Sequence, residues 1–192
     1  MLHSNFQDVA TPNDWSPDGQ FLLYSTVETI AAKRDLWVLP SDGRKPMPFM
    51  RTSFDEAWGR FSPNGRWIAY VSDQSGVGDV YVRAFTADFS GGSAATGGPV
   101  LVSRGGGTAP RWRRDGKELF YLAADGKMMA VEVTTGSEFR AGTPAPLFQT
   151  PSGTIVGDVT ADGRRFLLVT PIGPSASAPF TVVLNWTAGL KK

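Results

Sequence analysis

The chain has 192 residues, and 41% of them are hydrophobic, so it is long and apolar enough to bury a sizeable core and a disordered chain is excluded. Its 19 Lys and Arg residues almost balance its 18 Asp and Glu residues. The resulting net charge of +1 excludes a global field that would attract nucleic acid or an acidic membrane surface. The absence of cysteine excludes a disulfide framework, a thiolate nucleophile and Cys-based zinc sites.

A short turn motif occurs four times along the chain, first as Trp15-Ser-Pro-Asp-Gly19. Proline presets its own φ, Asp or Asn favours the turn, and glycine takes the positive φ from which the chain re-enters a strand, so each copy predicts a hairpin. The glycines lie 46, 51 and 47 residues apart, which is close to the period of four-stranded propeller blades. The four copies are Trp15–Gly19, Phe61–Gly65, Trp112–Gly116 and Val159–Gly163.

An apolar run follows each repeat glycine and does not alternate with polar residues, which indicates a strand covered on both faces, as in a blade between two other blades. The position five residues after the glycine is tyrosine in three copies and leucine in the fourth. The runs are 21–24, 67–70, 119–122 and 166–169, and the residues at the position five after the glycine, which we call the tyrosine column, are Tyr24, Tyr70, Tyr121 and Leu168.

A third strand is expected after each apolar run, at 35–39, 79–82, 127–133 and 180–186, and a fourth, outer strand at 47–50, 100–102 and 147–149. The connection 86–98, rich in Gly, Ala and Ser, is interpreted as a mobile loop. These elements predict an all-β fold, a β-propeller with about four four-stranded blades. The blades run roughly over 8–51, 52–104, 105–150 and 151–192 and form a single propeller region.

These turns and strands resemble the TolB-like, WD-repeat-like family of bacterial β-propellers, whose blades carry a Trp/Phe-Ser-Pro-Asp-Gly turn before an apolar strand. The resemblance spans nearly the whole chain and is closest at 15–24 and 61–70. It implies a ring of six or more blades, of which this chain would be a part. The ending 180–192 resembles the C-terminus of bacterial proteins in which a propeller follows a serine/threonine kinase domain and a membrane span.

Five residues before each repeat glycine stands a charged side chain, Asp14, Arg60, Arg111 or Asp158. The next residue in each copy, Trp15, Phe61, Trp112 or Val159, is expected to pack between blades. Strand alternation then turns the charges to the opposite side, toward the central channel that the first strand of a blade lines. We predict that Asp14 lies near Arg60 and Arg111 near Asp158, either as a ligand site or as ion pairs that only join blades.

No catalytic constellation is evident, and we expect no enzyme, cofactor or metal site. The only histidine, His3, lies near the terminus, and neither a Gly-x-Ser-x-Gly elbow nor kinase motifs are present. Asp18, Asn64, Asp115 and Asp162 are interpreted as turn formers. The basic cluster 111–114 contains Trp112, but this residue occupies the column expected to be buried, so no nucleic-acid partner is expected.

The sequence therefore predicts a non-catalytic binding or scaffold module for a protein or peptide ligand, as the sensor or interaction part of a membrane-anchored serine/threonine kinase. A TolB-like exported scaffold and the propeller of a prolyl-oligopeptidase-like hydrolase remain alternatives. Further expected partners are missing propeller blades or a second copy of the chain. Because no signal peptide or apolar run of about 18 residues is present, we expect no direct membrane insertion. A periplasmic or extracytoplasmic location follows if the parent is membrane-anchored.

Overall fold

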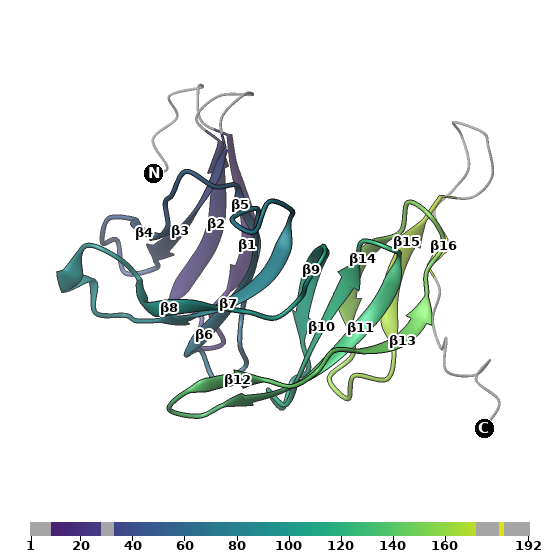
Figure 1. The fold of residues 1–192 in the computed structure, drawn as a ribbon. Coiled ribbons are helices and arrows are strands. Elements are labelled where there is room, and N and C mark those ends of the chain that lie inside the picture. Colours follow the sequence, from purple (N-terminus) through teal and green to yellow (C-terminus); the bar gives the residue numbers. More distant parts are fainter. Residues whose placement is uncertain (1–8, 28–32, 172–180, 183–192) are drawn as a thin grey trace.

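The computed structural model describes residues 9–27, 33–171 and 181–182, which form four antiparallel sheets in chain order (Figure 1). We call the sheets blades 1 to 4. Blade 1 contains β1 (Val9–Trp15), β2 (Phe21–Val27), β3 (Arg34–Pro40) and β4 (Met47–Met50), and blade 2 contains β5 (Glu56–Phe61), β6 (Trp67–Ser72), β7 (Asp79–Phe85) and β8 (Ala95–Leu101). Blade 3 contains β9 (Gly107–Trp112), β10 (Glu118–Ala123), β11 (Lys127–Thr135), β12 (Phe139–Ala141) and β13 (Ala145–Gln149), and blade 4 contains β14 (Ile155–Val159), β15 (Phe166–Thr170) and β16 (Thr181–Val182).

The repeated turn has the expected geometry. In its first copy the Ser16 hydroxyl donates to the Asp18 carboxylate at 2.5 Å, and the Gly19 amide donates to the Ser16 carbonyl at 2.8 Å. The four repeat glycines have φ between 69° and 73°, the left-handed region in which a side chain is strained. The interpretation of the Asp and Asn residues as turn formers is therefore confirmed.

Each blade packs on its neighbours through alternate residues of its second strand. In β6, Ile68 and Tyr70 belong to the core shared with blade 1, whereas Ala69 and Val71 belong to the core shared with blade 3. A third core joins blades 3 and 4 through Phe120 of β10 and other buried residues. The runs in blades 2 and 3 are thus buried on both faces, as predicted, whereas in the run of blade 4 Leu167 is 36% exposed.

The expectation of four strands in every blade holds for blades 1 and 2 and is wrong for blade 3. Strand β11 is longer than expected, and the residues beyond its pairing with β13 form a hairpin with β12. Phe139 of β12 is buried between Trp67 and Trp112, with ring centroids 5.6 and 6.2 Å away, which fixes this extra hairpin against blade 2. In blade 4 the described residues form three strands, and the rest of the strand expected at 180–186 lies outside them.

The connection 86–98, interpreted as a mobile loop, contains regular structure over part of its length. This connection contains a short 3-10 helix, η1 (Phe89–Gly91), and the first residues of β8. The Ala94 amide donates to the Pro48 carbonyl of β4 at 2.9 Å, and Ala94 is fully buried. Ala94 and Ala95 are buried in the core that blade 2 shares with blade 1, whereas the four glycines of this connection have open space around them.

The first strands of the blades lie next to one another. Strand β5 contacts both β1 and β9, and β9 contacts β14. The four blades therefore follow one another with blade 1 at one end and blade 4 at the other (Figure 1). No helix within the described part of the chain is long and apolar enough to cross a membrane.

Candidate functional site

Each first strand contains an irregularity in register just before its charged repeat residue. The pairing shifts between Pro12 and Asp14 in β1 and between Val156 and Asp158 in β14, with matching shifts in β5 and β9. Trp58 and Ala109, within the shifts in β5 and β9, have φ of 56° and 52°, which side-chain-bearing residues rarely adopt. Such bulges redirect the following side chain, and they are frequent next to binding sites.

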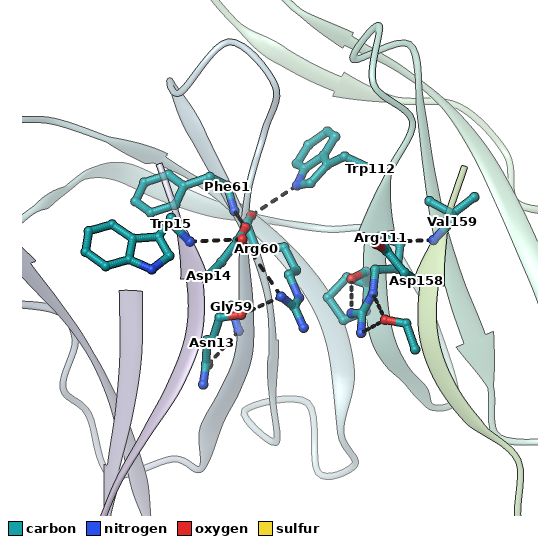
Figure 2. A network of polar contacts seen from close by, with 12 residues as sticks. Asn13, Asp14, Trp15, Gly59, Arg60, Phe61, Arg111, Trp112, Asp158 and Val159 are labelled. Atoms are coloured by element: carbon teal, nitrogen blue, oxygen red, sulfur yellow. Dashed lines mark hydrogen bonds and ion pairs between the residues drawn. The ribbon is translucent and has the colours of Figure 1, made fainter. Parts of the chain in front are cut away.

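The four charged repeat residues line one recess of about 280 Å³, together with Phe61, Pro63, Trp112 and Gly157. Figure 2 shows that they come from the four neighbouring first strands. The geometry agrees with the prediction that these four residues lie close together, namely Asp14, Arg60, Arg111 and Asp158. Their role in binding stays a prediction.

Asp14 and Arg60 join blades 1 and 2. Nη1 of Arg60 lies 3.9 Å from Oδ1 of Asp14 and also donates to the carbonyl of Asn13, while Oδ2 of Asp14 accepts the Phe61 amide at 2.9 Å. Burial raises the pKa of Asp14, and the Phe61 amide and the charge of Arg60 oppose that rise. The side chain of Asn13 adds a further bond, because its Oδ1 accepts the Gly59 amide at 3.0 Å.

Arg111 lies near Asp158 but binds backbone instead. Its Nε and Nη2 donate to the Gly157 carbonyl at 3.0 and 2.8 Å, and Nη2 also donates to the Val156 carbonyl at 3.0 Å. No ion pair joins Arg111 and Asp158 in the described structure, and Oδ1 of Asp158 accepts the Val159 amide at 2.8 Å. Burial and the charge of Arg60 lower the pKa of Arg111 to about 10, against the opposing charges of Asp158 and Asp14.

The expectation that Trp15, Phe61, Trp112 and Val159 all pack between blades is only partly correct. Phe61 and Trp112 are 5% and 8% exposed, and Val159 is half-buried against the core between blades 3 and 4. Trp15, however, is 54% exposed, because no blade precedes blade 1 among the described residues. Figure 2 shows the Trp112 indole directed toward blade 2, where Nε1 donates to the Arg60 carbonyl at 3.1 Å.

Sequence reasoning missed a buried polar network around Asp79, which is 2% exposed. Its carboxylate accepts the Ser103 hydroxyl at 2.8 Å, the Ser75 hydroxyl at 2.7 Å and the Gly106 amide at 2.9 Å. The signal was present, since an Asp begins the third strand that the sequence predicts in each of the first two blades. No group of three metal-ligating side chains occurs among the residues that the structure describes.

Replacing Asp14 by alanine is expected to lower the free energy of unfolding by about 1 to 2 kcal/mol, because the Phe61 amide loses its acceptor at the blade interface. Urea denaturation measures this loss. Asp158→Ala is the matched control, since Asp158 holds the same repeat position and, within the described part of the chain, accepts only the amide of its own neighbour Val159. Its expected loss is below about 0.5 kcal/mol, and equal losses for both variants would contradict a role of Asp14 between blades.

Comparison with known proteins identifies the class of fold. No protein-family model and no curated protein sequence matches the chain. Among solved structures it is similar to TolB from Acinetobacter baumannii, with a TM-score of 0.65 and 19% identity over 92% of this chain and 41% of the TolB chain. The chain is therefore an all-β protein of TolB-like, propeller-type fold, and it spans less than half the length of the TolB chain.

Two further solved structures are similar to this chain. One is a puromycin-hydrolysing peptidase of Mycobacterium tuberculosis, with a TM-score of 0.57 and 22% identity over 85% of this chain and 28% of the peptidase chain. The other is the periplasmic gluconolactonase PpgL of Pseudomonas aeruginosa, with a TM-score of 0.57 and 17% identity over 90% of this chain and 56% of the other. At these identities the similarity defines the fold alone.

Proposed function

We propose that the chain is a non-catalytic propeller module that binds a protein or peptide ligand at the recess between Asp14, Arg60, Arg111 and Asp158. The observation that carries the proposal is the guanidinium of Arg60. Its Nη1 is bound by Asp14 and Asn13, but its buried Nε has no acceptor among the described residues. A buried donor without a partner is costly, and a carboxylate or carbonyl of a ligand would satisfy it if the guanidinium, part of which is exposed, turned toward the recess.

The carboxylates on either side of Arg60 and Arg111 give the recess both signs of charge. A peptide offers amide donors and carbonyl acceptors together, and an acidic side chain or C-terminus adds the charge that Arg60 favours. Peptides with a carboxylate are therefore the expected ligands.

Selection from a random peptide library displayed on phage tests this function. The unaltered chain is expected to enrich peptides that share an acidic residue, and Arg60→Gln is expected to retain them at least tenfold less well. Arg44→Gln, which alters an exposed ion pair with Asp42 away from the recess, is the control and should retain the peptides like the unaltered chain. No enrichment, or equal retention by Arg60→Gln, would overturn the proposal.

We propose further that this module is the sensor or interaction part of a membrane-anchored serine/threonine kinase and acts outside the cytoplasm. The resemblance of residues 180–192 to the ends of such proteins supports the parent, and the similarity to a periplasmic gluconolactonase supports the compartment. The similarity to TolB favours an exported scaffold as a second candidate. Reading the DNA upstream of Met1 in frame separates them, because only a kinase parent predicts kinase motifs and a membrane span there.

A further inference from the structure

We call the face of a blade that is directed toward the preceding blade its entry face. The face directed toward the following blade is its exit face. In blades 2 and 3 the entry face contains the residues four before, three after and five after the repeat glycine, and all six are at most 8% exposed. These residues are Phe61, Ile68, Tyr70, Trp112, Leu119 and Tyr121. In each of the three interfaces between neighbouring blades of the chain, the entry face of one blade is therefore covered by the exit face of the preceding blade.

Blade 1 has the same entry face, and no blade of the described structure lies against it. The equivalent residues are Trp15, Leu22 and Tyr24. Tyr24 is already 9% exposed within the chain, whereas Trp15 is exposed and Leu22 half-buried, and these two lie directly opposite each other in the pairing of β1 and β2. Trp15 is 54% exposed, although the tryptophan at its position in blade 3 is 8% exposed. A large aromatic side chain in solvent at a position that is buried in blades 2 and 3 marks this face as an interaction surface.

Blade 4 presents the complementary exit face. Leu167 is 36% exposed, whereas the residues at its position in blades 2 and 3, Ala69 and Phe120, are 0% and 2% exposed. Val169 and Ile155 lie on the same face, since they are paired across β14 and β15, and Ile155 is 65% exposed. One chain therefore carries both halves of the interface that it uses three times internally, at opposite ends of its row of blades (Figure 1).

We propose that the entry face of blade 1 binds the exit face of blade 4 of a second copy of this chain. The contact is head-to-tail, so it uses two different surfaces and extends or closes a ring of blades. Asp158 supports this arrangement. Its counterpart Asp14 accepts its own Trp15 amide with Oδ1 and the amide of Phe61 in the next blade with Oδ2, while Asp158 accepts only the amide of Val159 among the described residues.

Sedimentation velocity of the chain between about 1 and 100 μM tests the proposal. The unaltered chain is expected to associate within this range, and Trp15→Glu and Leu167→Glu are each expected to weaken association at least tenfold. Val77→Glu is the matched control, because Val77 is 48% exposed in the turn between β6 and β7, and it should associate normally. Thermal melting checks that each variant is folded. We expect both variants to fold because the two altered residues are exposed.

Mixing the two blocked variants distinguishes a head-to-tail contact from other arrangements. Trp15→Glu retains an intact exit face and Leu167→Glu an intact entry face, so an equimolar mixture is expected to form a dimer that neither variant forms alone. A monomeric unaltered chain at every concentration would overturn the proposal and leave the face to a blade of different origin. Association of Leu167→Glu alone with no gain on mixing would also overturn it, because that result requires contact between two entry faces.

Discussion

Replacing Trp112 by alanine is expected to lower the free energy of unfolding by about 3 to 5 kcal/mol. Trp112 is 8% exposed and belongs to the core between blades 2 and 3, where its ring meets Phe139 edge to face. Its removal leaves a cavity in that core and deprives the Arg60 carbonyl of the indole donor at 3.1 Å. Equilibrium denaturation in urea measures the loss.

Trp15→Ala is the control for this prediction, because the two tryptophans occupy the same position of the repeat. With 54% of its surface exposed, Trp15 buries little in a single chain, and its replacement should cost less than about 1 kcal/mol. The comparison is made at low protein concentration, where self-association through Trp15 does not contribute. Similar losses for both variants would show that Trp112 does not hold blades 2 and 3 together.

Much of the fold could be predicted from the sequence because its signals are local and repeated. The turn at Trp15–Gly19 needs particular residues at particular φ values, and this need recurs in each copy. The column of Tyr24, Tyr70 and Tyr121 follows from the same period, and all three are at most 9% exposed. Equivalent positions of the repeat differ only in what surrounds them, because their surroundings depend on which neighbouring blades are present.

The errors arose where neighbouring blades decide the outcome. Trp15 reads as a core residue by its position, but the blade that would cover it is absent from the described structure. Arg111 lies near Asp158 as predicted, but no ion pair joins the two in the described structure. The bulge in β14 instead directs the carbonyls of Val156 and Gly157 at its guanidinium, and no pattern of charged residues reveals where a carbonyl points.

The hairpin of β11 and β12 was missed for a related reason. Beyond Val133 the chain continues as a strand with no second apolar run to mark it, and Phe139 is the one large side chain that holds the return strand between Trp67 and Trp112. A single aromatic residue in a polar segment is too weak a signal for a strand. The packing role of Phe139 is evident only from the contacts of its ring with the aromatic rings of blades 2 and 3.

Glu56 is expected to make the protein less stable as the pH rises. Its side chain is fully buried, Oε1 accepts the Thr52 hydroxyl, and Oε2 has no partner among the described residues. Burial raises the pKa of Glu56 to about 7, and the carboxylates of Asp35, Asp73 and Asp55 add to that rise against the opposing Thr52 bond. The folded chain therefore retains this proton in a range where the unfolded chain has lost it.

The sign of the effect follows from the raised pKa. Below the ordinary value of 4.5 both states are protonated and the stabilisation is complete, and it is lost as the pH rises toward about 7. The loss amounts to about 3 kcal/mol, since each pKa unit corresponds to about 1.4 kcal/mol. Glu56→Gln preserves the shape of the side chain and cannot ionise, so the difference in unfolding free energy between it and the unaltered chain should change by that amount.

Urea denaturation of both chains between about pH 5 and pH 8 measures this difference and cancels the titration of the other groups. Asp42→Asn is the control, because the amide of Arg44 keeps the pKa of exposed Asp42 below its usual value and Asp42 stays ionised in both states over this range. Its profile should run parallel to that of the unaltered chain. If the difference between Glu56→Gln and the unaltered chain is the same at both ends of the range, Glu56 is ionised in the folded chain. In that case the positive charges of Lys33 and Arg34, which pair with Asp73 and Asp55, must also stabilise the ionised Glu56.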